Sequence, residues 1–109
     1  MQIAVHTCRT DLAQALKTYV ERRLRFSLDR FRGLVGRAIV RVSPDGPKEI
    51  RCLISIEVDS LGRIAVEESE ADLFAVIDRA TGKIGRLVGR ELERSRDARM
   101  SRESVRRAA

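Results

Sequence analysis

The chain has 109 residues, 43% of them hydrophobic and 35% charged, so we expect one soluble domain with a single core. No apolar run approaches the ~20 residues of a membrane-spanning helix, and the N-terminus lacks a signal peptide's pattern, so a cytoplasmic protein is expected. The net charge is +6, and arginine, whose planar guanidinium suits phosphate, supplies 19 of the 22 cationic residues.

The positive charge lies in the two ends of the chain. Residues 1–36 carry seven cationic and three acidic residues (net +4), residues 37–70 five and seven (net −2), and residues 71–109 ten and six (net +4). The two basic parts have helical periodicity, so one layer of the fold should hold the positive potential. Such a layer attracts polyanions and indicates RNA or DNA binding. Alternatively, arginine merely replaces lysine on solvated helix backs.

The first basic part predicts a strand followed by an amphipathic helix. Residues 2–8 alternate as a strand, and Thr10 or Asp11 is expected to cap the helix that follows. Gly33 and Gly36 are expected to end this helix. Its buried stripe, with spacings of three to four residues, comprises Leu12, Leu16, Tyr19, Val20, Leu24, Leu28 and Phe31.

The acidic middle predicts three strands joined by two tight turns. Residues 37–42, 50–58 and 64–66 alternate between apolar and polar side chains. Proline and glycine mark a turn at residues 43–47, and residues 59–62 form a second hairpin connection. An antiparallel meander with one packed face and one solvated face is expected.

The last part predicts a second amphipathic helix from residue 71, with Asp72 at its N-terminus, where the helix dipole favours negative charge. The apolar periodicity fades beyond Leu92. Residues 98–109 are interpreted as a basic tail, either a frayed helix end or a segment disordered without a partner. The stripe comprises Leu73, Val76, Ile77, Ala80, Ile84, Leu87, Val88 and Glu91.

These elements predict an α+β fold of order β-α-β-β-β-α, with two helices packed on one face of a four-stranded sheet, as in double-stranded-RNA-binding domains. The helix backs, which carry the basic residues, should then face water.

Three glycines and four cationic residues distinguish the second helix. Gly82, Gly85 and Gly89 share one face, and each costs about 1 kcal/mol relative to alanine in a helix. They indicate either close approach of RNA or a partner helix, or else drift, a kink or tight packing on the sheet. A basic ridge lies beside them, formed by Arg79, Lys83, Arg86 and Arg90.

The sequence does not favour an enzyme, a cofactor or a metal site. It has no Ser/His/Asp set, no phosphate-binding glycine loop and no metal-ligand spacing. His6 and Cys8 are interpreted as packing residues, and the carboxylates at residues 67–70 as solvated rather than as paired catalytic acids. Aromatic residues are too few for a protein that grips single strands by stacking bases on a sheet.

Two blocks of the sequence carry a resemblance to a known family. The first comprises residues 1–3 (Met-Gln-Ile) and residues 15–21 (Ala-Leu-Lys-Thr-Tyr-Val-Glu), with Arg23 and Leu24. The second comprises residues 72–78 (Asp-Leu-Phe-Ala-Val-Ile-Asp), with Lys83, Ile84 and Arg86. The chain resembles, over residues 1 to about 95, the short type of the ribosome hibernation promoting factor and ribosome-associated inhibitor A family, the sigma-54 modulation proteins. Residues 7–9, Ala13, Phe26 and Ser27 depart from its pattern.

The resemblance implies a non-enzymatic stress and stationary-phase factor that binds the small ribosomal subunit. Such proteins contact 16S rRNA between head and body and occupy the channel of mRNA and tRNA, which blocks translation. Residues 1–97 would form the ribosome-binding domain, a monomer off the ribosome, without a membrane or small-molecule partner. The expected RNA-binding residues are Arg22, Arg23, Arg25, Arg30, Arg79, Lys83, Arg86 and Arg90.

Two other functions fit the same pattern. One is a general module for structured RNA that reads a duplex by shape. The other is a protein-interaction module that self-associates through the glycine face of the second helix.

Overall fold

The computed structural model describes the backbone of residues 1–108 and the side chains of residues 1–101. It confirms the α+β fold and the element order. In chain order the elements are β1 (Gln2–Thr7), the 3-10 helix η1 (Thr10–Leu12), α1 (Ala13–Leu28), the 3-10 helix η2 (Asp29–Phe31), β2 (Val35–Pro44), β3 (Ile50–Val58), β4 (Gly62–Glu70) and α2 (Leu73–Ala108).

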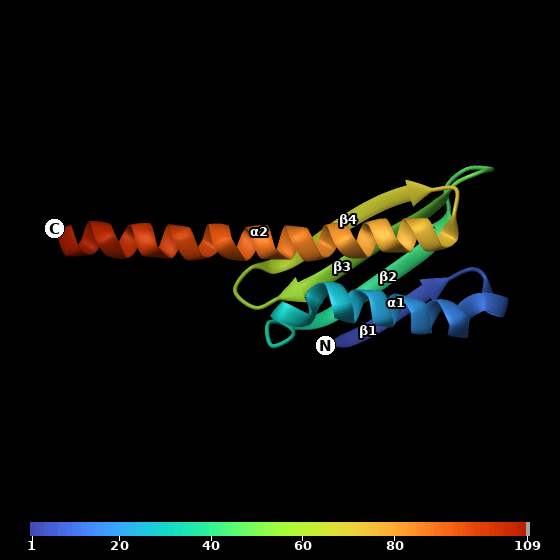
Figure 1. Ribbon diagram of the computed structural model, residues 1–109, viewed down its shortest axis with the longest axis horizontal. Helices are drawn as coiled ribbons and strands as arrows, with labels where there is room; N and C mark the ends of the chain where they lie inside the picture. The colour runs from blue at the N-terminus through green and yellow to red at the C-terminus, as the bar shows by residue number, and fades with distance from the viewer. Residues whose placement is uncertain (109) are drawn as a thin grey trace.

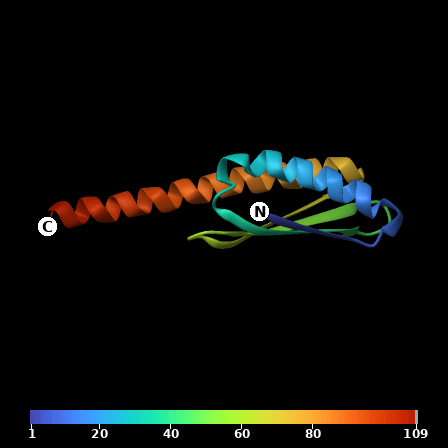
Figure 2. The same ribbon diagram turned by 90° about the horizontal axis from the view of Figure 1, so that it is seen from below.

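The four strands lie side by side in the order β1-β2-β3-β4. Strands β2, β3 and β4 form the expected antiparallel meander, whereas β1 pairs parallel to β2. A parallel pair needs a crossover connection, and α1 supplies it. Both helices cover the same face of the sheet, and the other face is left open (Figures 1 and 2).

The core lies between the helices and the covered face, and the periodicities of the sequence predict it well. Helix α1 buries Leu16, Val20, Leu24 and Leu28, spaced by four residues. Along β2, β3 and β4 the apolar residues of one face are buried at alternate positions, with Ser55 of β3 buried as well, while those of β1 are half-buried. The fully buried side chains of α2 are Val76, Ile77, Ala80, Thr81, Ile84 and Val88.

Asp72 lies just before α2, where the sequence predicts a negative charge, and it also caps the helix. Its Oδ1 accepts a hydrogen bond from the backbone N–H of Phe74 at 3.0 Å, and its carbonyl accepts one from Val76 at 3.0 Å. This satisfies N–H groups that the first turn of a helix leaves without partners.

The ends predicted for α1 are wrong. Neither Thr10 nor Asp11 caps it, because both lie in η1 and Asp11 pairs with Arg9 at 3.1 Å instead. At its other end, α1 stops at Leu28 and tightens into η2, so Gly33 follows the helical segment by two residues. Gly36 lies in β2, where the pairing with β3 shifts register.

Helix α2 is much longer than the sheet that supports it. Its 36 residues span about 54 Å at 1.5 Å per residue, and its C-terminal half projects beyond the strands (Figures 1 and 2). The backbone assigned to a basic tail at residues 98–109 is helical as far as Ala108. The side chains of its Arg102, Arg106 and Arg107 lie outside the described residues.

Candidate nucleic-acid interface

Helices α1 and α2 approach each other closely at Gly85. A Cβ added to Gly85 would lie 2.8 Å from the carbonyl oxygen of Ser27 in α1, closer than real Cβ contacts allow. Gly85 is therefore explained by tight packing within the chain, although the packing is against α1 and not against the sheet as expected, and not by close approach to RNA or to a partner helix. Because this part of the glycine face is filled from within, it is not free for self-association.

A polar contact joins the helices about two turns away. The Tyr19 hydroxyl of α1 donates a 2.5 Å hydrogen bond to Asp78 of α2, and this bond raises the pKa of Tyr19 above its ordinary value. The ring of Tyr19 also meets Phe74 edge to face, with centroids 4.9 Å apart. Arg23 places its Nε 3.0 Å from the same carboxylate, an ion pair without hydrogen-bond geometry. Arg23 thus belongs to the joint between the helices.

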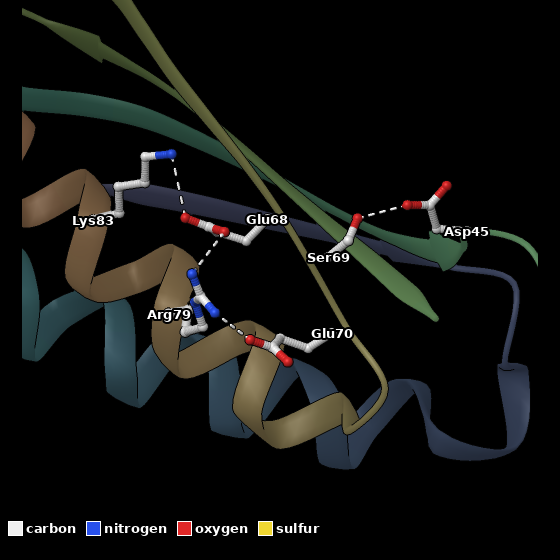
Figure 3. A network of polar contacts seen from close by, with 6 residues as sticks. All are labelled: Asp45, Glu68, Ser69, Glu70, Arg79 and Lys83. Atoms are coloured by element: carbon white, nitrogen blue, oxygen red, sulfur yellow. Dashed lines mark hydrogen bonds and ion pairs between the residues drawn. The ribbon is translucent and has the colours of Figure 1, made fainter. Parts of the chain in front are cut away.

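Two members of the basic ridge are paired with carboxylates of β4 (Figure 3). Lys83 Nζ lies 3.2 Å from Glu68 Oε1, and Arg79 Nη2 lies 3.6 Å from Glu68 Oε2. Arg79 also donates to Glu70, and this hydrogen bond raises the pKa of Arg79. The side chain of Glu68 is only 16% exposed. Strand β4 therefore neutralises the part of the ridge that lies above it.

The prediction that these carboxylates are simply solvated is wrong. Besides Glu68 and Glu70, Glu67 lies 2.9 Å from Arg51 on the open face of the sheet. The reason is geometric: β4 ends just before α2 begins, so its last side chains lie beside the first turns of the helix (Figure 3).

The other five candidate residues are exposed cations. Within the described side chains, none of them lies within ion-pair distance of a carboxylate. They are Arg22, Arg25, Arg30, Arg86 and Arg90. All eight candidate residues lie on the layer that covers the sheet. Three of them are therefore paired with carboxylates, and five are not.

Arginine guanidinium groups lie beside the other two glycines of α2. A Cβ on Gly89 would lie 3.3 Å from Arg30 Nη2, and a Cβ on Gly82 would lie 3.3 Å from Arg86 Nη1. Arg30 also lies over the ring of Phe31, 4.8 Å from its centroid. The absence of a side chain at each glycine lets a guanidinium lie against the backbone of α2, and for Arg30 this brings a cation of η2 onto the second helix.

The sequence reasoning omitted two exposed arginines of the same layer. Arg96 and Arg99 lie on the projecting part of α2, where the apolar periodicity has faded. In the sequence only the density of arginine indicated these two residues. No apolar stripe is present there to show which face of the helix is turned away from a core.

The open face of the sheet carries a mixture of charges. Arg37 and Arg41 are exposed on it, while Arg51 pairs with Asp45 at 2.9 Å and Arg63 donates to Ser55 at 2.6 Å. Glu57 lies opposite Arg63. Cations and carboxylates therefore alternate on this face, and two of its four arginines have polar partners.

The described residues contain no group of three or more His, Cys, Asp or Glu side chains arranged to hold a metal ion. Cys52 is buried in the core, which raises the pKa of its thiol to about 12, whereas Cys8 is exposed. Within the same part of the chain, no helix has both the length and the apolar character needed to cross a membrane.

Comparison with known proteins identifies the family. The family model described as "Sigma 54 modulation protein / S30EA ribosomal protein" matches residues 3–96. The chain belongs to this family. The match confirms the resemblance noted in the sequence, and it covers the whole sheet, α1 and the supported part of α2.

Solved structures agree with the S30EA assignment. The N-terminal domain of Protein Y from Thermus thermophilus is 34% identical, with a TM-score of 0.71 over 83% of this chain and 98% of that one. A ribosomal subunit interface protein from Coxiella burnetii is 14% identical, with the same TM-score over 85% of this chain and 99% of that one. At that identity, the second likeness shows the fold alone. No curated protein matches the chain.

Proposed function

We propose that this S30EA-family protein is a ribosome hibernation factor that inhibits translation without catalysing a reaction. In this proposal it binds the small ribosomal subunit in the channel of mRNA and tRNA, with its helices against 16S rRNA. Family membership supports a ribosomal role, as does the name of the family itself. A ribosome-bound protein works in the cytoplasm.

The observation that carries the proposal is the set of exposed arginines without carboxylate partners in the described helical layer. This set comprises the five candidates named above together with Arg96 and Arg99. An arginine already paired with a carboxylate must break that contact to bind a phosphate, whereas an unpaired one is available at once. Guanidinium groups bind phosphate oxygens in a bidentate manner, so this layer suits the backbone of folded RNA. The paired residues Arg23, Arg79 and Lys83 are proposed as secondary contributors.

Binding of this kind releases counterions from the RNA, so affinity should fall steeply as salt rises, with a logarithmic slope of about −0.7 to −0.9 for each phosphate contacted. Co-sedimentation with purified small subunits at two salt concentrations measures this effect. The key variant is Arg86→Glu with Arg90→Glu, which reverses two uncompensated cations of α2.

A matched control is available on the opposite face. Arg37→Glu with Arg41→Glu changes the net charge equally but alters only the open face of the sheet. The proposal predicts that the helix variant loses pelleting and that the sheet variant keeps it. Equal pelleting of both variants would exclude the helical surface, and a wild-type chain that never pellets would exclude the function.

The same co-sedimentation assay, with an RNA duplex added as competitor, distinguishes the hibernation factor from a general RNA-binding module. An arbitrary RNA duplex that competes with subunits at comparable concentration would favour a module without ribosomal specificity. Competition only at much higher duplex concentration supports the hibernation factor.

A further inference from the structure

The outer face of α1 exposes an aromatic ring to solvent. Phe26 is 79% exposed, the highest value among the large hydrophobic side chains of the described residues, and it lies outside the hydrophobic core. The other exposed phenylalanine, Phe74, is 51% exposed and is held edge-on by Tyr19. Of these two rings, only that of Phe26 has no aromatic neighbour among the described residues. A ring this exposed buries little apolar area on folding, and its face is available to a partner.

Cations flank this ring along the helix. Arg22 lies four residues before Phe26 on α1, and therefore one turn away on the same face of the helix. Arg30 lies four residues after Phe26, in the 3-10 helix η2 that continues α1. Both arginines are exposed, and neither pairs with a carboxylate of the described residues. The guanidinium of Arg30 lies over the ring of Phe31 and beside Gly89 of α2.

This combination selects one ligand chemistry. An unpaired nucleobase has a flat face that stacks on an aromatic ring, and the phosphates on either side of it need cations. A base-paired duplex would satisfy the arginines but not the ring, because its bases are already stacked. An acidic peptide would also pair with the arginines, but it offers no flat surface for the phenyl group.

We propose that Phe26 is a stacking platform for one unpaired base of RNA, with Arg22 and Arg30 binding the flanking phosphates. This inference rests on the proposed RNA-binding function and makes it more specific, because it places a single-stranded or bulged nucleotide over the middle of α1. A single platform on a helix differs from the sheet of stacked aromatics that the composition of the chain argues against.

Substitutions at this position separate stacking from simple hydrophobic contact. Loss of one stacked base should weaken binding to small subunits by about 5- to 100-fold in Phe26→Ala. Phe26→Leu should lose as much, since leucine keeps the apolar volume but not the flat face, while Phe26→Tyr and Phe26→Trp should bind like wild type. The salt slope should stay unchanged in all four variants, because no charge is altered. By contrast, Arg22→Ala should reduce it.

Phe26→Trp also provides a direct reporter, because the chain contains no tryptophan. Stacking should quench its fluorescence when subunits, or a single-stranded oligoadenylate, are added, and an RNA duplex of equal length should not. A tryptophan at Phe74 serves as the control and should not be quenched at saturation. Circular dichroism and thermal melting check that each variant is folded.

The outcomes distinguish this inference from the function on which it rests. If wild type pellets with subunits but Phe26→Ala and Phe26→Leu bind equally well, the stacking platform is wrong and the function stands. If wild type does not pellet but oligoadenylate quenches the tryptophan at position 26, the ribosomal function is wrong and the platform stands. Absence of quenching with both ligands overturns the platform.

Discussion

Gly85 of α2 lies against the backbone of Ser27 in α1, at a distance where a Cβ would sit only 2.8 Å from the Ser27 carbonyl oxygen. The crossing of the two helices therefore depends on the missing side chain. Gly82, one turn earlier on the same helix, faces only the end of the flexible Arg86 side chain, whose Nη1 would lie 3.3 Å from an added Cβ.

The two glycines should respond to alanine in opposite directions. Gly85→Ala forces backbone against backbone and should lower the free energy of unfolding by about 1–3 kcal/mol. Gly82→Ala should raise it by about 0.5–1 kcal/mol, because alanine favours the helix and Arg86 can move away. Urea unfolding followed by circular dichroism measures both. A stable Gly85→Ala variant would show that the helices are not packed as described.

Acid should weaken the contacts that Asp45 makes. Hydrogen bonds from Ser69 at 2.6 Å and from Arg51 at 2.9 Å hold the pKa of Asp45 below its ordinary value of 3.8. Since the pKa is lower in the folded state, this carboxylate contributes stability above its unfolded pKa. That contribution is lost as the pH falls through the folded pKa.

We therefore expect Asp45→Asn to be less stable than wild type near neutral pH and to approach wild type at pH values below the ordinary Asp range. Thermal melting of both proteins across an acid series measures the difference. A gap between the two melting temperatures that stays constant with pH would show that the charge of Asp45 has no role in stability.

Much of this fold follows from the sequence, and the exceptions have physical causes. Periodicity identified the buried stripe of α1 and the alternation of the strands, because a side chain's direction within one element depends on local geometry alone. The missing caps of α1 and the pairing of Glu68 with Lys83 were not predictable in the same way. Both depend on how the chain outside the element is placed.

The same distinction applies to the candidate site. Arginine spacing gave the ridge on α2, since residues three and four apart share a helix face. It gave no means to divide the ridge into Arg79 and Lys83, which β4 neutralises, and Arg86 and Arg90, which lack such partners among the described residues. The stripe did separate the half-buried ring of Phe31, which contacts the core, from the exposed ring of Phe26, which lies outside it.

Release of the paired cations should strengthen RNA binding. Glu68→Gln removes the carboxylate that holds Lys83 and one of the two that hold Arg79. We expect tighter binding to small subunits at low salt and a salt slope steeper by up to about one for each additional phosphate contact. The cost in stability should be small, about 0–1 kcal/mol, because Arg79 and Lys83 are largely solvated.

Glu57→Gln provides the control for Glu68→Gln, since it removes one negative charge from the open face of the sheet. If both variants bind subunits equally tightly, net charge alone explains the gain, and the release of Lys83 and Arg79 has no specific effect. Titrations at several salt concentrations separate the two explanations.

The projecting part of α2 should contribute to binding without supporting the fold. Leu92 is the last side chain of the described residues that packs against the core, and residues 96–101 are exposed. A chain truncated after residue 97 should therefore keep the melting temperature of the full chain. It should bind subunits more weakly and with a shallower salt slope, because Arg99 and the arginines beyond it are lost. Melting and subunit titration of the truncated chain measure the two effects separately. A lower melting temperature would mean that residues beyond 97 stabilise the domain, and unchanged binding would mean that RNA contacts end on the supported part of α2.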